Sequence, residues 1–246
     1  MVLSFVIARK MKDIILSIRK ELKENTDNKT KKSFQRFFKE KVKYHGVKTA
    51  IVGKIAKKYW KEIESFPKKE IFSLCEELYK SDYTEEAFIV SFWIPKLSKK
   101  FERKDIILFK RWILKYINNW AKCDGFCNHS VGGFMQKFPE SVNELKGCAK
   151  SENRWLRRAS AVSLIIPAKK GEFLKEAFEI SDILLLDKDD MVQKGYGWLL
   201  KEASRKHEKE VFSYVIKNKK NMPRTALRYA IELMPKELKR KAMKKN

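Results

Sequence analysis

Helix-breaking residues are so scarce in this chain that they leave little room for anything except helices. The 246 residues include only nine glycines and six prolines. Strong helix formers dominate, and the alternation of β-branched and polar residues that marks strands is nearly absent. Apolar residues instead recur every three or four positions, which is the spacing of an amphipathic helix. The pattern predicts an all-α fold along the whole chain.

Successive helices with short connections can be placed along the sequence. Four prolines stand where helices would begin, a position that suits proline because the first helical turn needs no N–H donor: Pro67, Pro139, Pro223 and Pro235. Asp82 with Glu85 resembles a capping box before the helix that contains "EEAFIVSFWI". The predicted helices cover residues 3–22, 27–43, 48–63, 67–80, 84–98, 103–119, 121–136, 139–149, 152–166, 172–185, 189–205, 208–219, 223–233 and 235–245.

The arrangement of these helices predicts a repeat architecture. Short connections imply that consecutive helices are antiparallel neighbours. Helix pairs recur at about 35–45 residues, the range of HEAT-type repeats, although no residue-level repeat is visible. We expect one domain over residues 1–246, a curved α-solenoid of HEAT-like antiparallel helix pairs whose basic concave face binds an extended ligand. A globular helical bundle is the alternative.

The charge of the chain points to a polyanionic partner. Lysine and arginine number 56 against 31 aspartates and glutamates, which gives a formal net charge of +25. Such an excess indicates nucleic acid first and an anionic membrane surface second; a generally lysine-rich proteome is the alternative. No segment reaches the roughly 18 apolar residues of a membrane span. The N-terminal "MVLSFVIARK" is interpreted as the start of a first helix rather than a signal peptide, so we expect a cytoplasmic protein without membrane contact.

The four cysteines are predicted to be reduced thiols. They are Cys75, Cys123, Cys127 and Cys148, and no secretory signal accompanies them. The spacing of Cys123, Cys127 and His129 lacks the second half of a zinc site, so buried structural thiols are the preferred interpretation. We expect no metal and no organic cofactor.

The helix predicted at 152–166 places three arginines beside its apolar stripe. Arg154, Arg157 and Arg158 lie at the i, i+3 and i+4 spacing that brings side chains together. Crowded guanidinium groups repel one another unless an anion lies against them, and the planar fork of arginine suits phosphate. Intramolecular acid partners are the alternative. The predicted core stripe of this helix is Trp155, Ala159, Val162 and Ile166.

In "DMVQKGYGWLLKEASR" one tryptophan lies away from the predicted core. The helical neighbours of Trp198 are Lys194, Lys201 and Arg205. An indole on a basic face can stack on a sugar or base beside phosphates; packing on a neighbouring repeat is the equal alternative. The predicted core stripe is Val192, Tyr196, Leu199 and Ala203.

Other basic faces repeat this theme. In "KTAIVGKIAKKYWKEI" an apolar stripe around Ile51, Ile55 and Tyr59 leaves lysines outside, and "MPRTALRYAIE" carries Arg224 and Arg228 on one face. Together these faces indicate phosphate binding that is independent of base sequence and weakens steeply as salt rises. The outward lysines of the first segment are Lys54, Lys57, Lys58 and Lys61.

The segment "NNWAKCDGFC" holds a carboxylate among small and apolar neighbours. If it is helical, Trp120 and Asp124 lie one turn apart, and the indole shields the carboxylate from water. A desolvated carboxylate beside an indole stabilises the positive charge that develops on a sugar when a glycosidic bond breaks, and it can orient water. A purine alkylated at N3 or N7 is already cationic and leaves without a general acid. The alternative, which these residues alone favour, is that Asp124 caps a helix or pairs with a core arginine.

Five sequence blocks together resemble the AlkD-like DNA alkylation-repair proteins, a family of HEAT-like-repeat DNA glycosylases. They occur in the family's order and cover nearly the whole chain. Each block is moderately specific, and the ordered set is strong. The blocks are "YHGVKTA" (44–50), "NNWAKCD" (118–124), "NRWLRRASAVSLI" (153–165), "VQKGYGWLLKEAS" (192–204) and "MPRTALRYAIE" (222–232).

The resemblance implies a monofunctional glycosylase that releases cationic N3- and N7-alkylpurines from duplex DNA held in a basic channel. By the family pattern Asp124 is the catalytic carboxylate, Trp120 and Trp198 are the tryptophans of the cleft, and Arg157 or Arg158 contacts the DNA backbone near the lesion. No base flipping, Schiff base or obligate protein partner is expected, and the protein should be a monomer. A noncatalytic nucleic-acid-binding or protein-interaction scaffold is the rival. The expected DNA-binding residues are Arg154, Arg157, Arg158, Lys194, Lys201, Lys48, Arg224 and Arg228.

Overall fold

The computed structural model describes residues 2–244, and over this range the chain is all-α with no strand. The predicted fold class is confirmed. The chain divides into two compact units: unit 1 runs up to Phe101, and unit 2 begins at Glu102. The expectation of a single domain stays a prediction. In the described range, none of the helices is long and apolar enough to cross a bilayer.

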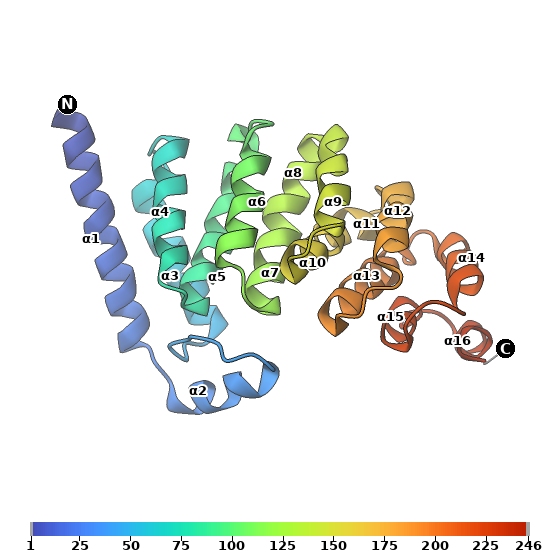
Figure 1. The fold of residues 1–246 in the computed structure, drawn as a ribbon. Helices are drawn as coiled ribbons and strands as arrows, with labels where there is room; N and C mark the ends of the chain where they lie inside the picture. The colour runs from blue at the N-terminus through green and yellow to red at the C-terminus, as the bar shows by residue number, and fades with distance from the viewer. Residues whose placement is uncertain (1, 245–246) are drawn as a thin grey trace. The chain divides into compact units, whose positions relative to one another are not determined.

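Unit 1 consists of antiparallel helices and one long loop (Figure 1). Helix α1 packs on α3 and α4, and α5 packs on both α3 and α4. Residues 38–48 connect η1 to α3 without helical structure. The elements are α1 (Val2–Glu24), α2 (Asn28–Phe34), η1 (Gln35–Phe37), α3 (Thr49–Ile63), α4 (Lys68–Lys80), α5 (Thr84–Trp93) and η2 (Ile94–Lys100).

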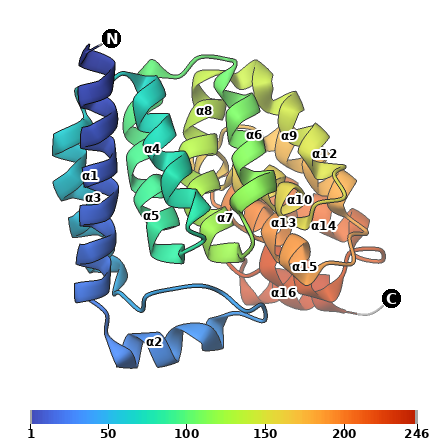
Figure 2. The ribbon, with the colours of Figure 1, turned by 60° about the vertical axis from the view of Figure 1, so that its left-hand side comes forward.

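Unit 2 is built around α10 and α13, which pack on each other (Figure 2). Helix α10 also contacts α6, α7 and α9, and α13 also packs on α12 and α15. The elements are α6 (Asp105–Tyr116), α7 (Trp120–Phe126), the π-helical turn η3 (Cys127–Val131), α8 (Gly132–Lys137), η4 (Pro139–Ser141), α9 (Val142–Ala149), α10 (Arg154–Val162), α11 (Ile165–Lys169), α12 (Leu174–Leu184), α13 (Asp190–Ala203), α14 (Glu208–Asn218), α15 (Arg224–Ala230) and α16 (Lys236–Met243).

Most predicted helices are present, and the four prolines stand at helix starts as expected. Pro67, Pro223 and Pro235 immediately precede α4, α15 and α16, and Pro139 is the first residue of η4. The predicted helix 27–43 is wrong beyond Phe37, where the chain becomes the extended loop. The predicted helix 152–166 is interrupted between α10 and α11.

The predicted capping box at Asp82 and Glu85 is also wrong. Asp82 adopts a left-handed backbone with φ of 65°, and Tyr83 is the residue that precedes α5. Glu85 is 2% exposed and faces the loop 38–48 instead of its own helix end. Its carboxylate accepts hydrogen bonds from the backbone N–H groups of His45, Gly46 and Val47 at 2.8–3.1 Å. A buried carboxylate satisfied by three N–H groups fixes this loop.

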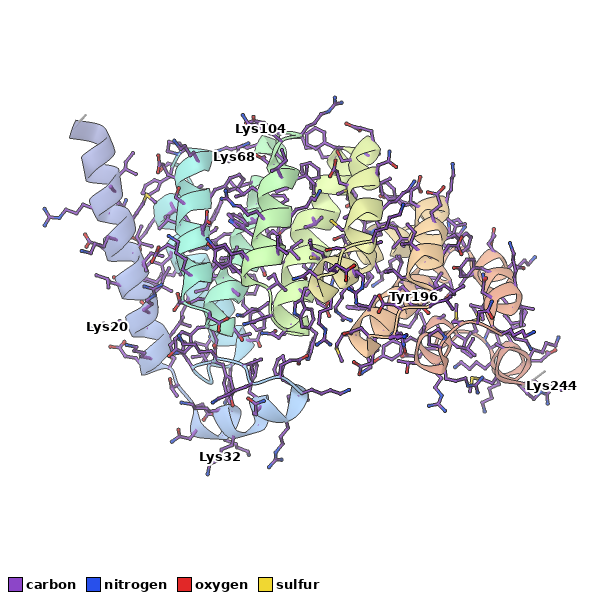
Figure 3. The ribbon with its side chains drawn as sticks, in the orientation of Figure 1. Lys20, Lys32, Lys68, Lys104, Tyr196 and Lys244 are labelled. Atoms are coloured by element: carbon purple, nitrogen blue, oxygen red, sulfur yellow. The ribbon has the colours of Figure 1, made fainter. Side chains whose placement is uncertain are left out.

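The predicted apolar stripes form the cores of the two units. In α13 the four predicted residues are at most 1% exposed; Figure 3 labels one of them, Tyr196. In α10 the stripe is buried except for Ile166, which is half-buried because the helix breaks before it. In α3, Ile55 and Tyr59 are buried and the four predicted outward lysines are exposed.

Candidate active site

Asp124 lies on the short helix α7 in the interior of unit 2. The side chain of Asn119 accepts a hydrogen bond from the backbone N–H of Lys122 at 3.0 Å and so starts this helix at Trp120. The helical backbone places Trp120 one turn before Asp124, as expected from the sequence. Trp120 is half-buried, and Asp124 is 9% exposed.

The Asp124 carboxylate forms a two-point ion pair with Arg158. Nε of Arg158 donates to Oδ1 at 2.9 Å, and Nη2 donates to Oδ2 at 2.7 Å. Arg158 is only 5% exposed, so both charges are held away from water. The structure therefore shows Asp124 paired with a core arginine, which was the alternative to a catalytic role in the sequence analysis. Any catalytic proposal has to start from this pair.

Arg158 also connects the carboxylate to helix α13. Its Nη1 donates to the backbone oxygen of Met191 in the first turn of that helix. A Cβ atom at Gly195 would lie 3.4 Å from Cγ of Arg158, so the glycine brings the α13 backbone close to the guanidinium side chain. Trp198 lies three residues after Gly195 and therefore on the same side of α13. Trp198 is half-buried.

The electrostatics of the pair combine two opposing effects. Burial raises the pKa of the Asp124 carboxyl, and the Arg158 guanidinium opposes this rise. For Arg158, burial disfavours the charge, but the Asp124 carboxylate raises its pKa above the ordinary value. The guanidinium thus stays charged and favours the ionised form of its partner.

The Asp124 side chain is paired but not fully shielded from solvent. The Asp124 side chain keeps 12% of its surface exposed, twice the fraction of the Arg158 side chain. Each carboxylate oxygen has two lone pairs, and the ion pair uses one on each. Each carboxylate oxygen thus keeps a lone pair that the ion pair with Arg158 does not use.

The other two arginines of α10 also have acid partners. Arg154 pairs with Asp189 at 2.8 Å and stacks over the ring of Trp155. Arg157 pairs with Asp187 at 2.6 Å and donates to two backbone oxygens. Intramolecular acid partners, the alternative to a phosphate clamp, are thus present for all three arginines. Contact of these arginines with DNA stays a prediction.

The lysines expected around Trp198 lie on α13 and are each half-buried. Lys194 pairs with Asp190 at 3.4 Å, and Lys201 pairs with Glu232 at 3.1 Å. Both lysines thus have an acid partner, and contact of their ammonium groups with phosphate stays a prediction. The convergence of Trp198 with Asp124 on one DNA sugar stays a prediction.

The remaining expected DNA-binding residues lie at the protein surface. Arg224 and Arg228 lie one turn apart on α15, the helix that packs against α13. Lys48 belongs to unit 1, where it immediately precedes α3. Their accessibility allows contact with a polyanion, and their role in DNA binding is still untested.

The four cysteines are buried free thiols, as predicted. Burial raises the pKa of Cys123 well above its ordinary value, and its neighbour Cys127 adds to the rise. Between residues 2 and 244, no group of three or more His, Cys, Asp or Glu side chains is arranged to hold a metal ion.

The sequence-based interpretation missed the residues that organise the site from other helices. Asp187 and Asp189 were not recognised as partners of the α10 arginines, and Gly195 was not recognised as the point of close approach. One available signal was the acidic run "DKDD" at 187–190, which complements "RWLRR" at 154–158. The other was the pair of glycines inside α13, which a helix keeps only for a reason such as close packing.

The model of the family described as "DNA alkylation repair enzyme" matches residues 18–234. The chain belongs to this family, which confirms the resemblance predicted from the five sequence blocks.

Solved structures support the fold. A predicted DNA alkylation repair enzyme from Enterococcus faecalis superposes with a TM-score of 0.77 at 15% identity, over 86% of this chain and 98% of that chain. The protein smu.31 from Streptococcus mutans UA159 superposes with a TM-score of 0.53 at 21% identity, over 80% of this chain and 98% of that chain. No curated protein matches the sequence significantly.

Proposed function

We propose that the protein is a monofunctional DNA glycosylase that hydrolyses the N-glycosidic bond of cationic N3- and N7-alkylpurines in duplex DNA. The bond between C1′ of the deoxyribose and the purine nitrogen breaks, and the base leaves as a neutral molecule. Water supplies the oxygen that replaces it at C1′, and its proton goes to solvent. The alkylated base needs no protonation to leave, so one carboxylate is sufficient.

The observation that carries the proposal is the buried and partly open carboxylate of Asp124. In the proposed reaction this carboxylate stabilises the developing sugar cation and orients the attacking water. Arg158 keeps the carboxylate ionised and fixes its orientation, so no reorganisation is needed when the bond breaks. A neutral side chain in the same place would lack the charge that lowers the barrier.

The two tryptophans serve as walls of the site in this proposal. Trp120 lies one turn before the carboxylate on α7. Trp198 follows by three residues Gly195, the point where α13 approaches Arg158. An indole face stabilises a sugar cation through its quadrupole. Arg154 and Arg157 of α10, the two arginines of α15 and the lysines of α13 contact DNA phosphates. Lys48, before α3, is a separate predicted phosphate contact in unit 1.

The test is release of free base from duplex DNA that contains 7-methylguanine. Asp124→Asn should lower the single-turnover rate by roughly 10²–10³-fold, the effect of losing one electrostatic partner of the transition state. Binding of undamaged duplex should persist. If Asp124→Asn were as fast as the wild type, the assignment of this residue would be wrong.

A control is needed because Asp124→Asn leaves the Arg158 charge buried without its partner. The double variant Asp124→Asn with Arg158→Gln removes both charges and leaves two neutral amide side chains in place of the ion pair. The rate should stay low in the double variant, although its thermal stability should recover towards that of the wild type. Recovery of the rate together with stability would show that the loss came from unfolding.

The paired state of Asp124 also favours a second candidate, a DNA-binding protein without catalysis. In that case the ion pair is only a core interaction. This protein would bind duplex with a steep dependence on salt and would release no base above the spontaneous rate. A third possibility, a protein-interaction scaffold, predicts no salt-sensitive DNA affinity.

A further inference from the structure

Unit 1 has a basic pocket of its own, of about 380 Å³. It lies where α1 and α4 meet the loop 38–48 and the start of α5. Four basic side chains line it against two carboxylates, so the lining carries an excess of positive charge. The basic residues are Arg19, Lys23, Lys43 and Lys80, and the acidic residues are Glu77 and Glu86.

The carboxylates of Glu77 and Glu86 are paired with basic residues of the same lining: Arg19 with both, and Lys80 with Glu77. Nε of Arg19 lies 3.1 Å from the buried carboxylate of Glu86, and its Nη2 lies 3.9 Å from Glu77. Lys80 pairs with Glu77 at 3.2 Å. The positive excess therefore rests on Lys23 and Lys43, which are both exposed.

Lys43 is held in place by groups that do not neutralise it. Its Nζ donates to the backbone oxygen of Ser81 at 2.9 Å and lies 4.6 Å from the centre of the Tyr83 ring. An ammonium has three N–H donors, so donors remain for a ligand. The ammonium of Lys43 is therefore a fixed positive charge at the pocket.

The buried side of the pocket carries an imidazole with one ring nitrogen that has no hydrogen-bond partner. His45 is 7% exposed, and its ring stacks on Tyr83 with centres 3.8 Å apart. Its Nε2 is buried without a hydrogen-bond partner and lies 4.0 Å from Glu86. Buried polar atoms normally have a partner, so an orphaned nitrogen in a pocket lining indicates a missing ligand. The three N–H groups bound to Glu85 hold the loop in this conformation.

We propose that this pocket binds a phosphate group. Lys23 and Lys43 supply the charge, and the planar guanidinium of Arg19 borders the site beside the His45 ring. The source is either a backbone phosphate of DNA or a free phosphate compound. The phosphate site does not depend on the chemistry proposed for Asp124; only its DNA source rests on that function.

The test removes the two lysines that carry the excess charge. Lys23→Ala and Lys43→Ala are made singly and together. Lys20→Ala is the matched control, because Lys20 is exposed on α1 outside the pocket (Figure 3). The full-length protein is titrated with inorganic phosphate in low-salt buffer, and binding is followed by calorimetry and by the NMR signals of the His45 ring. His45→Gln assigns those signals among the three histidines of the chain.

For a free phosphate compound, inorganic phosphate should bind saturably and shift the His45 signals. The double variant Lys23→Ala with Lys43→Ala should weaken binding about tenfold or more through the loss of charge-assisted contacts, and Lys20→Ala should not. For a DNA phosphate, the double variant should lower the affinity for undamaged duplex, and the slope of log affinity against log salt should fall by about one for each lost contact.

The proposal is overturned if the double variant and Lys20→Ala behave alike with both phosphate and duplex. If the double lysine variant bound phosphate and duplex as Lys20→Ala does while Asp124→Asn lost base release, this proposal would fail and the glycosylase proposal would stand. If the double lysine variant lost phosphate binding while Asp124→Asn released base as fast as the wild type, the glycosylase proposal would fail and this one would stand.

Discussion

Each of the two units buries a carboxylate, but the hydrogen-bonding groups of these two carboxylates are satisfied in different ways. In unit 1, Glu85 accepts hydrogen bonds from three consecutive backbone N–H groups and is 2% exposed. In unit 2, Asp124 is held by one arginine side chain and keeps an exposed edge. Backbone donors fix a loop, so the first arrangement serves structure. The arginine pair leaves a lone pair on each carboxylate oxygen unused, which is compatible with the reacting role proposed for Asp124.

The largest expected effect on stability tests whether the buried charges of Asp124 and Arg158 depend on each other. Arg158→Met leaves a buried carboxylate without a partner and should lower the free energy of unfolding by about 3–5 kcal/mol. The double variant Arg158→Met with Asp124→Asn should recover most of this loss. Urea unfolding of both variants measures the coupling. If the single and double variants were equally unstable, the guanidinium would matter through packing rather than charge.

A smaller effect is expected from the corresponding change in unit 1. Glu85→Gln removes the charge that strengthens the hydrogen bonds from the loop and should cost about 1.5–3 kcal/mol. The base-release rate of the folded fraction should stay unchanged, in contrast to Asp124→Asn. Glu62→Gln, an exposed change on α3, is the control and should shift stability by less than about 0.5 kcal/mol. A loss of base-release rate in Glu85→Gln would contradict the division between structural and reacting carboxylates.

The two glycines of α13 sharpen the comparison further. In Gly197→Ala the new Cβ would lie 2.7 Å from Cβ of Tyr229 and 2.8 Å from the backbone oxygen of Ala226, so α15 has to move. We expect a loss of about 1–3 kcal/mol. In Gly195→Ala the nearest atom is Cγ of Arg158 at 3.4 Å, which borders ordinary van der Waals contact, and the better helix propensity of alanine offsets the tighter packing. Thermal unfolding should therefore separate the two variants, and equal losses would contradict the close approach of α13 to α15.

The smallest expected effect is a shift of the pH profile. Because burial raises the pKa of Asp124, protonation should reduce base release at a higher pH than for an exposed aspartate. The rate should fall as pH drops through this raised pKa. Arg158→Gln removes the cation that opposes the rise, so the acidic limb should move to still higher pH. Single-turnover rates measured across the acidic range test this, and an unmoved limb in Arg158→Gln would argue against Asp124 as the titrating group.

Several features could be predicted from local sequence patterns. The scarcity of glycine and proline predicted the helices, and the apolar periodicity predicted the buried faces of α10 and α13. The spacing of Trp120 and Asp124 predicted that they lie one turn apart. These predictions succeeded because helical hydrogen bonds and side-chain periodicity involve residues only three or four positions apart.

The limits of sequence reasoning appear where a partner comes from another helix. Asp124 and Arg158 are 34 residues apart, and Glu85 and His45 are 40 residues apart. The capping box predicted for Glu85 followed a familiar local pattern, but three N–H groups of a distant loop competed for the same carboxylate. Likewise, nothing local distinguishes Arg158 from Arg157, although one is buried against Asp124 and the other pairs with Asp187.

The sequence by itself determined an all-helical, strongly basic protein of the DNA alkylation repair family and the helix faces that form its cores. Only the tertiary structure decided which charges neutralise one another, where a glycine lets two helices approach, and which histidine nitrogen is left without a partner. The physical reason is that ion pairing and burial depend on the packing register between helices, and this register is set by the whole core rather than by any single segment.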